Sequence, residues 1–393
     1  MRAIRSLLPG TTGGNYRPDL MQTFLDGLAQ WAPALNADWQ KDDKAGEFGH
    51  ERWKALVEAG LTGVVTSEDH GGLALSVQEL AELLETLGYI CEDAGLGFSL
   101  ATHLCSTCLP IEKFGSDDIK AELLPQLVEA SQVGAHAITE PDSGSDAFAM
   151  KSEAVRDGDD YILNGEKCYI SNAPVADICV VYARTHPTKG ALGGFSAFAV
   201  DCDSPGFTIG KKRSKMGLRT APMADLYFNN VRVPASRLIG REGQGFAILD
   251  YVMRWEILCV FAIQVGEMRR QLERSVAYAK ERKQFGAPIA SYQAISHRIA
   301  DMHMRLQSAR SWLSRMVRAM EGGGQASLEI ASAKLAISEA HVANSIDAIT
   351  LHGGSGYMSE TGVESHLRNA MGGLIYSGSS DIQKNRIAAM LGL

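Results

Sequence analysis

Positive charge is scarce in this sequence of 393 residues, which holds 38 Lys and Arg against 46 Asp and Glu. The formal charge of −8 argues against a nucleic-acid-binding protein, because few cations are available to neutralise phosphates. A short basic cluster occupies residues 211–215. Such a cluster is typical of a solvated loop, although it also suits a phosphorylated ligand. We therefore expect no nucleic-acid partner.

Long apolar runs are also missing. A helix that spans a bilayer needs about 20 consecutive apolar residues, and no run in the sequence approaches that length. The segment Met1–Gly10 contains only Leu7-Leu8 as an apolar stretch, which is too short for a signal peptide. We therefore expect a cytoplasmic protein with no membrane span.

The seven cysteines form no pattern of a disulfide framework, since their number is odd and they are scattered through apolar contexts. This usage is typical of reduced thiols in the cytoplasm. Cys105-Ser-Thr-Cys108 lacks the second ligand pair of a zinc site. It also lacks the βαβ setting of a thioredoxin-like redox site. We predict core thiols there and no metal site.

What is present is a chain of three regions with different hydrophobic periods. From about Asp19 to Ala135 the pattern is helical, as in Val77–Leu87, and from about His136 to Gly240 the period is two. From Phe246 onward the pattern is helical again. We predict a mainly α protein with a central β-domain. Its parts are an N-terminal helical domain (1–135), a small antiparallel β-barrel (136–242) and a C-terminal four-helix bundle (243–393).

In the central region, Asn164-Gly165 predicts a tight hairpin turn between two short strands. Further strands are predicted at Ile178–Tyr182, Phe195–Val200 and Leu226–Val233. Because no helices separate these strands, we expect antiparallel pairing. The glycine clusters that begin at Gly240 and Gly353 lack the strand–turn–helix setting of a dinucleotide fold, so a Rossmann domain is excluded. Helices are predicted over about Phe246–Lys280, Tyr292–Met320, Leu328–Thr350 and Glu360–Ile375, with a short one after Ser380.

Five motifs resemble those of the acyl-CoA dehydrogenase family and follow in the family's order. They are Thr139-Glu-Pro-Asp-Ser-Gly-Ser-Asp146, Leu163-Asn-Gly-Glu-Lys-Cys-Tyr-Ile-Ser-Asn-Ala173, Lys215–Arg219 with Leu226–Pro234, Arg282-Lys-Gln-Phe-Gly286 with Gln293, and Gly353–Tyr357. The resemblance runs from about residue 48 to the end of the chain. It implies an FAD-dependent dehydrogenase of acyl thioesters, carried on coenzyme A or on an acyl carrier protein.

The resemblance also implies roles for the matched positions. Thr139, Gly144 and Ser145 would face the flavin and its pyrophosphate, with Ser145 and Gly378 beside the substrate. Tyr169 would lie against the isoalloxazine ring, and the hydroxyl of Ser171 would reach flavin N5. Further cofactor-binding positions are Arg282, Phe285, Gln293, Gly353, Gly354, Ser379 and Asp381.

Arg282, Phe285 and Gln293 resemble residues that hold the FAD of a neighbouring subunit, which implies a homo-oligomer, either a tetramer or a dimer. The resemblance further implies an electron-transferring flavoprotein as the acceptor. Two positions depart from the family's pattern, since Thr350 replaces a glutamine and Ser379 replaces a threonine.

The base is the most informative departure. Many members carry a catalytic glutamate at the position of Ser377, and a serine cannot serve as the base at neutral pH. Glu256 lies ten residues before Gly266, as does the base of the isovaleryl-CoA and long-chain types. It also lies within an apolar helical stripe, where burial raises the pKa of a carboxyl toward that of a general base.

Other interpretations of these residues stay open at this point. Glu256 would be structural if it formed a salt bridge with an arginine from another helix. The arginine that often follows the base is Ile257 here, so what orients the thioester is not determined. The same fold also supports flavin-dependent oxidases and monooxygenases, the oxidation of α-hydroxy or amino acyl groups on carrier proteins, and a scaffold without cofactor.

Overall fold

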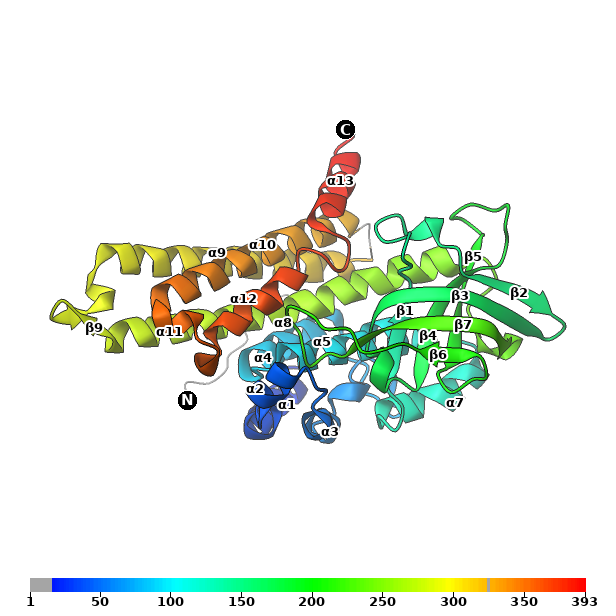
Figure 1. The fold of residues 1–393 in the computed structure, drawn as a ribbon, viewed down its shortest axis with the longest axis horizontal. Coiled ribbons are helices and arrows are strands. Elements are labelled where there is room, and N and C mark those ends of the chain that lie inside the picture. Colours follow the sequence, from blue (N-terminus) through cyan, green and yellow to red (C-terminus); the bar gives the residue numbers. More distant parts are fainter. Residues whose placement is uncertain (1–15, 324–325) are drawn as a thin grey trace.

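The computed structural model describes residues 16–323 and 326–393, so the expectation about Met1–Gly10 lies outside the described residues. Helices come first along the chain, then strands from Gly134 to Ile239, then helices again from Gly245 (Figure 1). This order confirms the predicted fold class. The division into three domains at residues 135 and 242 remains our proposal.

The N-terminal region is built from helices joined by short turns. α4 begins with a capping box, in which the Ser76 hydroxyl accepts from the Glu79 N–H and the Glu79 carboxylate accepts from the Ser76 N–H. A π-helical turn, η3 (Leu104–Cys108), joins α5 to α6. The helices are α1 (Pro18–Leu35), α2 (Trp39–Ala45), α3 (His50–Glu58), α4 (Val77–Ile90), α5 (Ala94–His103), α6 (Leu109–Phe114) and α7 (Asp117–Val128).

α5, η3 and α6 join into one helix, Ala94–Phe114. Its 21 residues are long and apolar enough to cross a membrane by length and composition, but 89% of that window is buried inside the protein. A core helix satisfies the same criteria. The absence of a membrane span therefore stays a prediction.

The central region forms one eight-stranded sheet with the order β6-β7-β3-β2-β4-β5-β8, in which β1 lies beside β4. Two expectations need correction. β1 and β2 pair with β4 in parallel, so the sheet is mixed rather than antiparallel. No pairing among the described strands joins β6 to β8, so a closed barrel is not observed. The strands are β1 (Gly134–Ala137), β2 (Glu153–Asp157), β3 (Asp160–Ser171), β4 (Ile178–Arg184), β5 (Phe195–Asp201), β6 (Phe207–Ile209), β7 (Met223–Pro234) and β8 (Leu238–Ile239).

The predicted hairpin at Asn164-Gly165 is wrong. Both residues lie inside the continuous strand β3, at a register shift against β7. The turn lies earlier, where Gly158 adopts a φ of +63° between β2 and β3. Gly165 is needed for another reason, because a Cβ there would collide with Ser152 of the segment entering β2. The glycine therefore permits close approach within the sheet.

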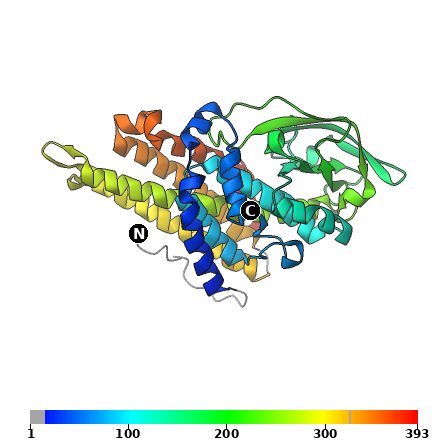
Figure 2. The same cartoon turned by 90° about the horizontal axis from the view of Figure 1, so that it is seen from below.

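The C-terminal helices agree with the prediction, since the ends of α8, α9 and α10 fall within two residues of the expected positions. α12 is shorter than expected. α8, α9, α10 and α12 pack together as the bundle, and the α8–α9 pair extends away from the sheet (Figure 2). The elements are α8 (Gly245–Glu281), β9 (Lys283–Gln284), β10 (Ala287–Pro288), α9 (Gln293–Glu321), α10 (Ser327–His352), α11 (Gly354–Tyr357), α12 (Val363–Gly372) and α13 (Ser380–Met390).

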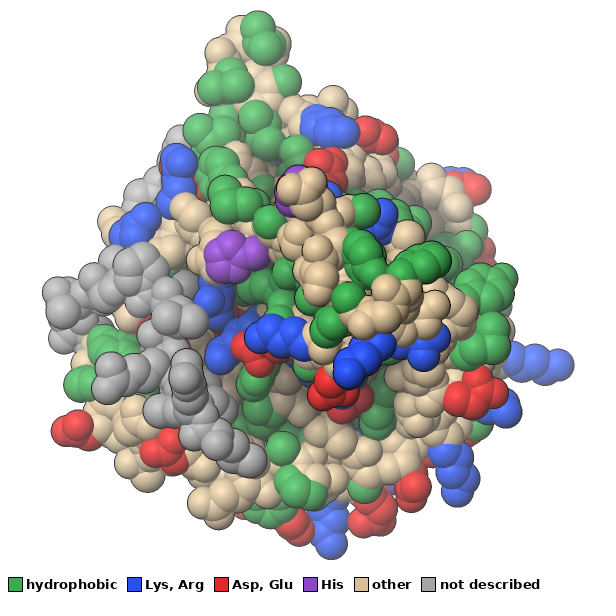
Figure 3. Space-filling model, turned by 90° about the vertical axis from the view of Figure 1, so that its left-hand side faces the viewer, with side chains coloured by type: hydrophobic (Ala, Val, Ile, Leu, Met, Phe, Trp, Pro, Cys, Tyr) green, Lys and Arg blue, Asp and Glu red, His purple; other side chains and the backbone are tan. Residues whose placement is uncertain are grey.

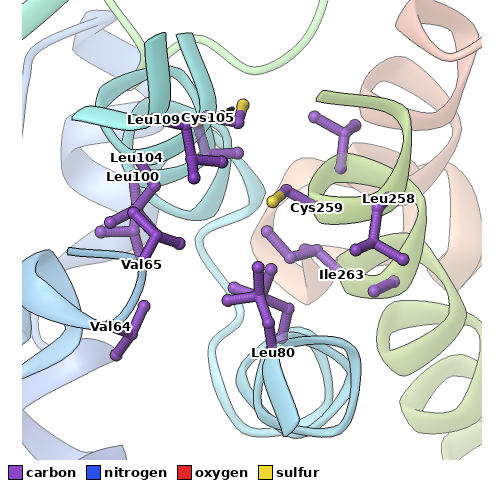
Figure 4. Close-up of a cluster of buried hydrophobic side chains, with 14 of the residues drawn as sticks. Val64, Val65, Leu80, Leu100, Leu104, Cys105, Leu109, Leu258, Cys259 and Ile263 are labelled. Atoms are coloured by element: carbon purple, nitrogen blue, oxygen red, sulfur yellow. Dashed lines mark hydrogen bonds between the residues drawn. The ribbon is translucent and has the colours of Figure 1, made fainter. Parts of the chain in front are cut away.

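α8 is held in place by its crossing with α4. Gly88 on α4 and Gly266 on α8 meet backbone to backbone, so that a Cβ on either residue would collide with the other helix. Next to this crossing, Leu80 and Ile263 face one another in a cluster that also holds Cys105 and Cys259 (Figure 4). The crossing fixes the helix that carries Glu256.

All seven cysteines are free thiols, and only Cys202 is not fully buried. Cys105 and Cys108 are each 0% exposed, which confirms the prediction that they are core thiols. Among the described residues, no group of three or more His, Cys, Asp or Glu side chains is arranged to hold a metal ion.

Candidate active site

Glu256 meets two hydroxyl groups from distant parts of the chain. Ser377, in the loop between α12 and α13, donates a hydrogen bond of 2.5 Å to Oε1 of Glu256. Ser106, in the π-helical turn η3, donates to Oε2 at 3.5 Å. Ser377 and Ser106 are buried and Glu256 is half-buried. The position of the family's common base and the position of Glu256 are therefore in direct contact.

No cation neutralises Glu256 in the described part of the chain. Arg254, two residues earlier, pairs with Asp250 at 2.5 Å instead. Burial raises the pKa of the Glu256 carboxyl, and the hydrogen bonds from Ser377 and Ser106 oppose this rise. The salt-bridge alternative is thus not observed, and the surroundings are those of a general base.

We predict that flavin reduction accelerates with rising pH, because a base with a raised pKa must lose its proton before it can act. Ser377→Ala removes a hydrogen bond that favours the charged form, so the pKa of Glu256 should rise further. The ascending limb of the pH–rate profile should then move to higher pH, with a loss of roughly tenfold on its acid side. Stopped-flow profiles of both proteins test this. An unmoved limb would contradict the role of Ser377.

The exposed aromatic ring of Tyr169 marks the candidate flavin surface. The residue is 59% exposed and adopts a φ of +59°, a conformation rare outside glycine. Its N–H donates to Asp225 Oδ1 at 3.2 Å, and the guanidinium of Arg213 lies 5.6 Å from the ring centre. Ser171 follows two residues later on β3 and is half-buried. An exposed ring beside a hydroxyl suits a flat heterocycle with polar edges.

The loop Thr139–Asp146 is held by a buried ion pair that sequence reasoning missed. Lys167 donates to Glu140 Oε1 at 2.8 Å, and the side chains are 0% and 5% exposed. Glu140 also accepts from the N–H groups of Lys151 at 2.5 Å and Ser152 at 2.9 Å. The available signal was a lysine at an inward position of a strand, where a charge needs a partner.

This anchoring leaves the rest of the loop open to a ligand. Gly144 and Ser145 are exposed, and no atom lies within 4 Å of a Cβ built on Gly144. Thr139 is half-buried, and its carbonyl accepts from the Cys168 N–H at 2.9 Å. The loop is thereby fixed directly to the strand that carries Tyr169. The donor set of hydroxyls and N–H groups fits the pyrophosphate of FAD.

Arg282, Phe285 and Gln293 lie at the opposite end of the bundle, and Figure 3 looks onto this end. All three are exposed, and Phe285 is 96% exposed with a φ of +50°. Between Glu256 and Arg282 the helix α8 rises by about 1.5 Å per residue, or about 39 Å in total. One chain therefore cannot bring these three residues close to its own Glu256.

The remaining predicted cofactor residues divide between the two ends. Gly353 and Gly354 are exposed and follow His352, whose carbonyl accepts from Tyr278 near the far end of α8. Ser379 and Asp381 follow Ser377 closely. The Ser379 hydroxyl caps α13 by accepting from the Ile382 N–H at 3.4 Å, which gives it a structural role as well. Among the described residues, no hydrogen bond or ion pair joins the side chain of Asp381 to Glu256, and Gly378 has no side chain to contribute.

The basic cluster at 211–215 is largely engaged within the chain. Lys212 pairs with Glu47 at 2.6 Å and Arg213 pairs with Asp225. Lys215 donates to the Ala221 carbonyl at 2.6 Å, and burial lowers the pKa of its ammonium group to about 8. The cluster is therefore not simply a solvated loop. Within the described part of the chain, Lys211 alone among these cations is exposed without a hydrogen bond or ion pair.

A small open pocket lies along α8 beyond Glu256. Val260, Ile263, Gln264 and Glu267 line it from α8, one to three turns beyond the base. The facing wall comes from the helices that precede the sheet and from the segment that ends in Ser377. The other lining residues are Ala94, Phe98, Leu218, Asn369 and Tyr376.

Models of three consecutive acyl-CoA dehydrogenase domains match the chain. The N-terminal domain matches residues 22–131, the middle domain residues 135–231 and the C-terminal domain residues 243–392. An L-prolyl-[peptidyl-carrier protein] dehydrogenase of Pseudomonas fluorescens is 42% identical over 88% of this chain and 91% of its own length.

Solved structures match over nearly the whole chain. The prolyl acyl carrier protein oxidase AnaB superposes with a TM-score of 0.93 at 37% identity, over 96% of this chain and 100% of that one. PigA with FAD and proline superposes with a TM-score of 0.92 at 38% identity, over 96% and 99% of the two chains.

Proposed function

This chain belongs to the acyl-CoA dehydrogenase family, and from that membership we propose that it is an FAD-dependent dehydrogenase of acyl thioesters in which Glu256 removes the α-proton. The observation that carries the choice of base is the contact between Glu256 and Ser377 at 2.5 Å. The Glu256 carboxyl, which pairs with no cation among the described residues, lies against Ser377. Ser377 occupies the position at which many members of the family carry their base. This function is an oxidoreductase activity.

The side chains of the site perform the proton transfer. Burial keeps the pKa of Glu256 high enough that its carboxylate accepts a proton readily, and Ser377 holds one of its oxygens in a fixed direction. Thr139, Ser145, Tyr169 and Ser171 would hold the cofactor, since Ser145 and Tyr169 are exposed and Thr139 and Ser171 are half-buried. Bound FAD supplies the acceptor for the hydride that leaves the β-carbon. Buried apolar residues around Glu256 exclude water.

For the substrate's carrier we propose an acyl or peptidyl carrier protein. Flavin reduction by coenzyme A thioesters alone would show that this choice is wrong. Support comes from the similar proteins, which include an L-prolyl-[peptidyl-carrier protein] dehydrogenase and a prolyl acyl carrier protein oxidase. A cytoplasmic location and an electron-transferring flavoprotein as acceptor complete the proposal.

Anaerobic mixing tests the function directly. Acyl thioesters on carrier protein and on coenzyme A should bleach the oxidised flavin without any external reductant. Bleaching only after an external reductant is added, with product formed only when oxygen is then admitted, would instead identify a monooxygenase. That second reading has one observation in its favour, the serine at position 377. The rate at which oxygen restores the colour then distinguishes a dehydrogenase from an oxidase.

A shared cofactor site predicts a homo-oligomer. Since Arg282 lies about 39 Å along α8 from Glu256, it would act on the FAD of a neighbouring subunit. Arg282→Ala should lower FAD affinity by at least about tenfold, because a charge-assisted contact is lost. Lys283→Ala, on the neighbouring exposed residue, should leave affinity unchanged. Light scattering measures the oligomeric state, and titration with FAD measures the affinity. A monomer that binds FAD fully would refute the shared site.

A further inference from the structure

The loop that carries Ser377 leads from α12 into α13, which projects from the bundle (Figure 1). Ser377 adopts a φ of +55° and Gly378 a φ of +79°, so two consecutive residues lie in the left-handed region. Glycine adopts this conformation freely, but the Cβ of a serine makes it unfavourable. Ser377 therefore needs support from the surrounding structure to keep this conformation.

Gln383, in the first turn of α13, closes this loop. Its amide Nε2 donates a hydrogen bond to the Ser377 carbonyl at 2.8 Å. A Cβ built on Gly378 would lie 2.7 Å from the same Nε2 atom, so the amide packs directly against the second left-handed residue. The side chain of Gln383 thus contacts both residues of the turn and supports its conformation.

Burial makes Gln383 unusual within its helix. It is the only residue of α13 that is fully buried, and its exposure is 0%. A helix usually places an apolar side chain at such a position, since burying a polar group is unfavourable unless it is hydrogen-bonded. The Oε1 atom of Gln383 is also buried and has no hydrogen-bond partner among the described residues. The glutamine therefore keeps its bond to Ser377 although its amide oxygen stays unsatisfied, and packing alone does not explain its presence.

The backbone conformation of Ser377 decides where its hydroxyl points. At a φ of +55° the hydroxyl donates to Oε1 of Glu256 at 2.5 Å. A right-handed or extended backbone at this residue would turn the Cα–Cβ bond elsewhere and break the contact. Glu256 would then keep only the longer hydrogen bond from Ser106, which measures 3.5 Å.

We propose that Gln383 is a positioning residue for the base, because it holds Ser377 in the left-handed conformation from which the serine hydroxyl reaches Glu256. This inference rests on the proposed function and adds a residue to the same site. No hydrogen bond joins Gln383 to Glu256 in the described part of the chain, so Gln383 acts through Ser377.

The other titratable groups around Glu256 stay uncharged. They come from three separate elements, namely Tyr376 from the same loop, Tyr182 from β4 and Cys105 from η3. Burial raises the pKa of each of these groups, so none of them ionises near neutral pH. A shift in the pH–rate profile therefore reports on the Glu256 carboxyl.

Gln383→Met tests the proposal, since methionine matches the length of the side chain but cannot donate to the Ser377 carbonyl. Once the hydroxyl is no longer held against Glu256, the pKa of that carboxyl should rise. The ascending limb of the pH–rate profile should move to higher pH, with flavin reduction about 3- to 10-fold slower on its acid side. Gln383→Asn keeps an amide that is one methylene too short, so it should give the same shift, and it replaces the methionine variant if that protein does not fold.

Gln271→Met is the matched control. Gln271 is buried on α8, its amide donates to the Ser345 hydroxyl at 3.0 Å, and its Oε1 atom is also unsatisfied among the described residues. The control therefore loses the same kind of hydrogen bond, but its pH–rate profile should not move. In the double variant of Ser377→Ala with Gln383→Met, the limb should lie where Ser377→Ala alone places it. An unmoved limb in the Gln383 variants, or additive shifts in the double variant, would overturn the proposal.

A direct titration separates this proposal from the function on which it rests. Infrared spectroscopy follows the C=O stretch of a protonated carboxyl, and the band of Glu256 is the one that Glu256→Gln removes. The midpoint of its titration should lie at higher pH in Gln383→Met than in the wild type, and an unchanged midpoint would contradict the proposal. If no thioester bleaches the flavin, the proposed function fails, and this titration still decides whether Gln383 acts on Glu256.

Discussion

Glu256→Gln should slow flavin reduction by acyl thioesters by about 10²- to 10⁴-fold, the usual worth of a positioned general base. The substitution keeps the shape of the side chain and an oxygen that accepts from Ser377. It removes only the ability to take up the proton. FAD content and thermal stability should be unchanged or improved, because burying the charged carboxyl is unfavourable in the wild type.

Asp250→Asn is the matched control for this experiment. It converts an acid to an amide on the same helix, at a side chain that is 33% exposed and pairs with Arg254. Its reduction rate should stay within about twofold of the wild type, since surface ion pairs contribute little. Stopped-flow absorbance under anaerobic conditions measures the rate of flavin reduction in the wild type and in the two variants. A Glu256→Gln protein that reduces its flavin at the wild-type rate would move the base elsewhere.

The contact with Ser377 offers a rescue. Adding Ser377→Glu to Glu256→Gln restores a carboxyl from the opposite side of the same contact, which measures 2.5 Å in the structure. We expect partial recovery of flavin reduction, because the new carboxyl occupies the base position that many members of the resembled family use. Recovery would show that the site requires a carboxyl at this point and tolerates either helix α8 or the loop as its source.

Lys167→Met should be the most destabilising single change near the site, with a loss of about 3–5 kcal/mol in the free energy of unfolding. It leaves the buried carboxylate of Glu140 without its cation, whose Nζ lies 2.8 Å away. Burial acts to raise the pKa of Glu140, but Lys167 and the backbone N–H groups hold it below the usual value. FAD affinity should fall with stability, because Glu140 anchors the loop that would hold the cofactor.

Two variants make this prediction specific. Lys151→Met breaks the ion pair with Asp142 beside the same loop, where the side chains are 73% and 76% exposed. It should change neither the free energy of unfolding nor the FAD affinity measurably. The double variant Glu140→Gln with Lys167→Met should be more stable than Lys167→Met alone, because no unpaired charge stays buried. Urea unfolding and the flavin-to-protein absorbance ratio measure both effects. Equal stability of Lys167→Met and Lys151→Met would refute the anchoring role.

The fate of Asn164-Gly165 shows where local sequence information fails. This dipeptide favours a tight turn on its own, but the structure uses it within β3. The reason is a long-range one, since the segment entering β2 at Ser152 packs against Gly165 and leaves no room for a side chain. The true turn, at Asp157-Gly158, carries a comparable local signal, so local information alone does not choose between the two dipeptides. Parallel pairing of β1 and β2 with β4 was missed for the same reason.

The sequence by itself determined the helix–strand–helix order, the ends of α8, α9 and α10, the family motifs and the isolation of Glu256 in an apolar stripe. These properties are local, because helical period and motif spacing depend on residues within a few turns of one another. Only the tertiary structure decided that Ser377 contacts Glu256, that Lys167 anchors Glu140, and that Gln264 and Glu267 line a pocket. The two contacts join residues 121 and 27 positions apart, and packing rather than periodicity brings them together.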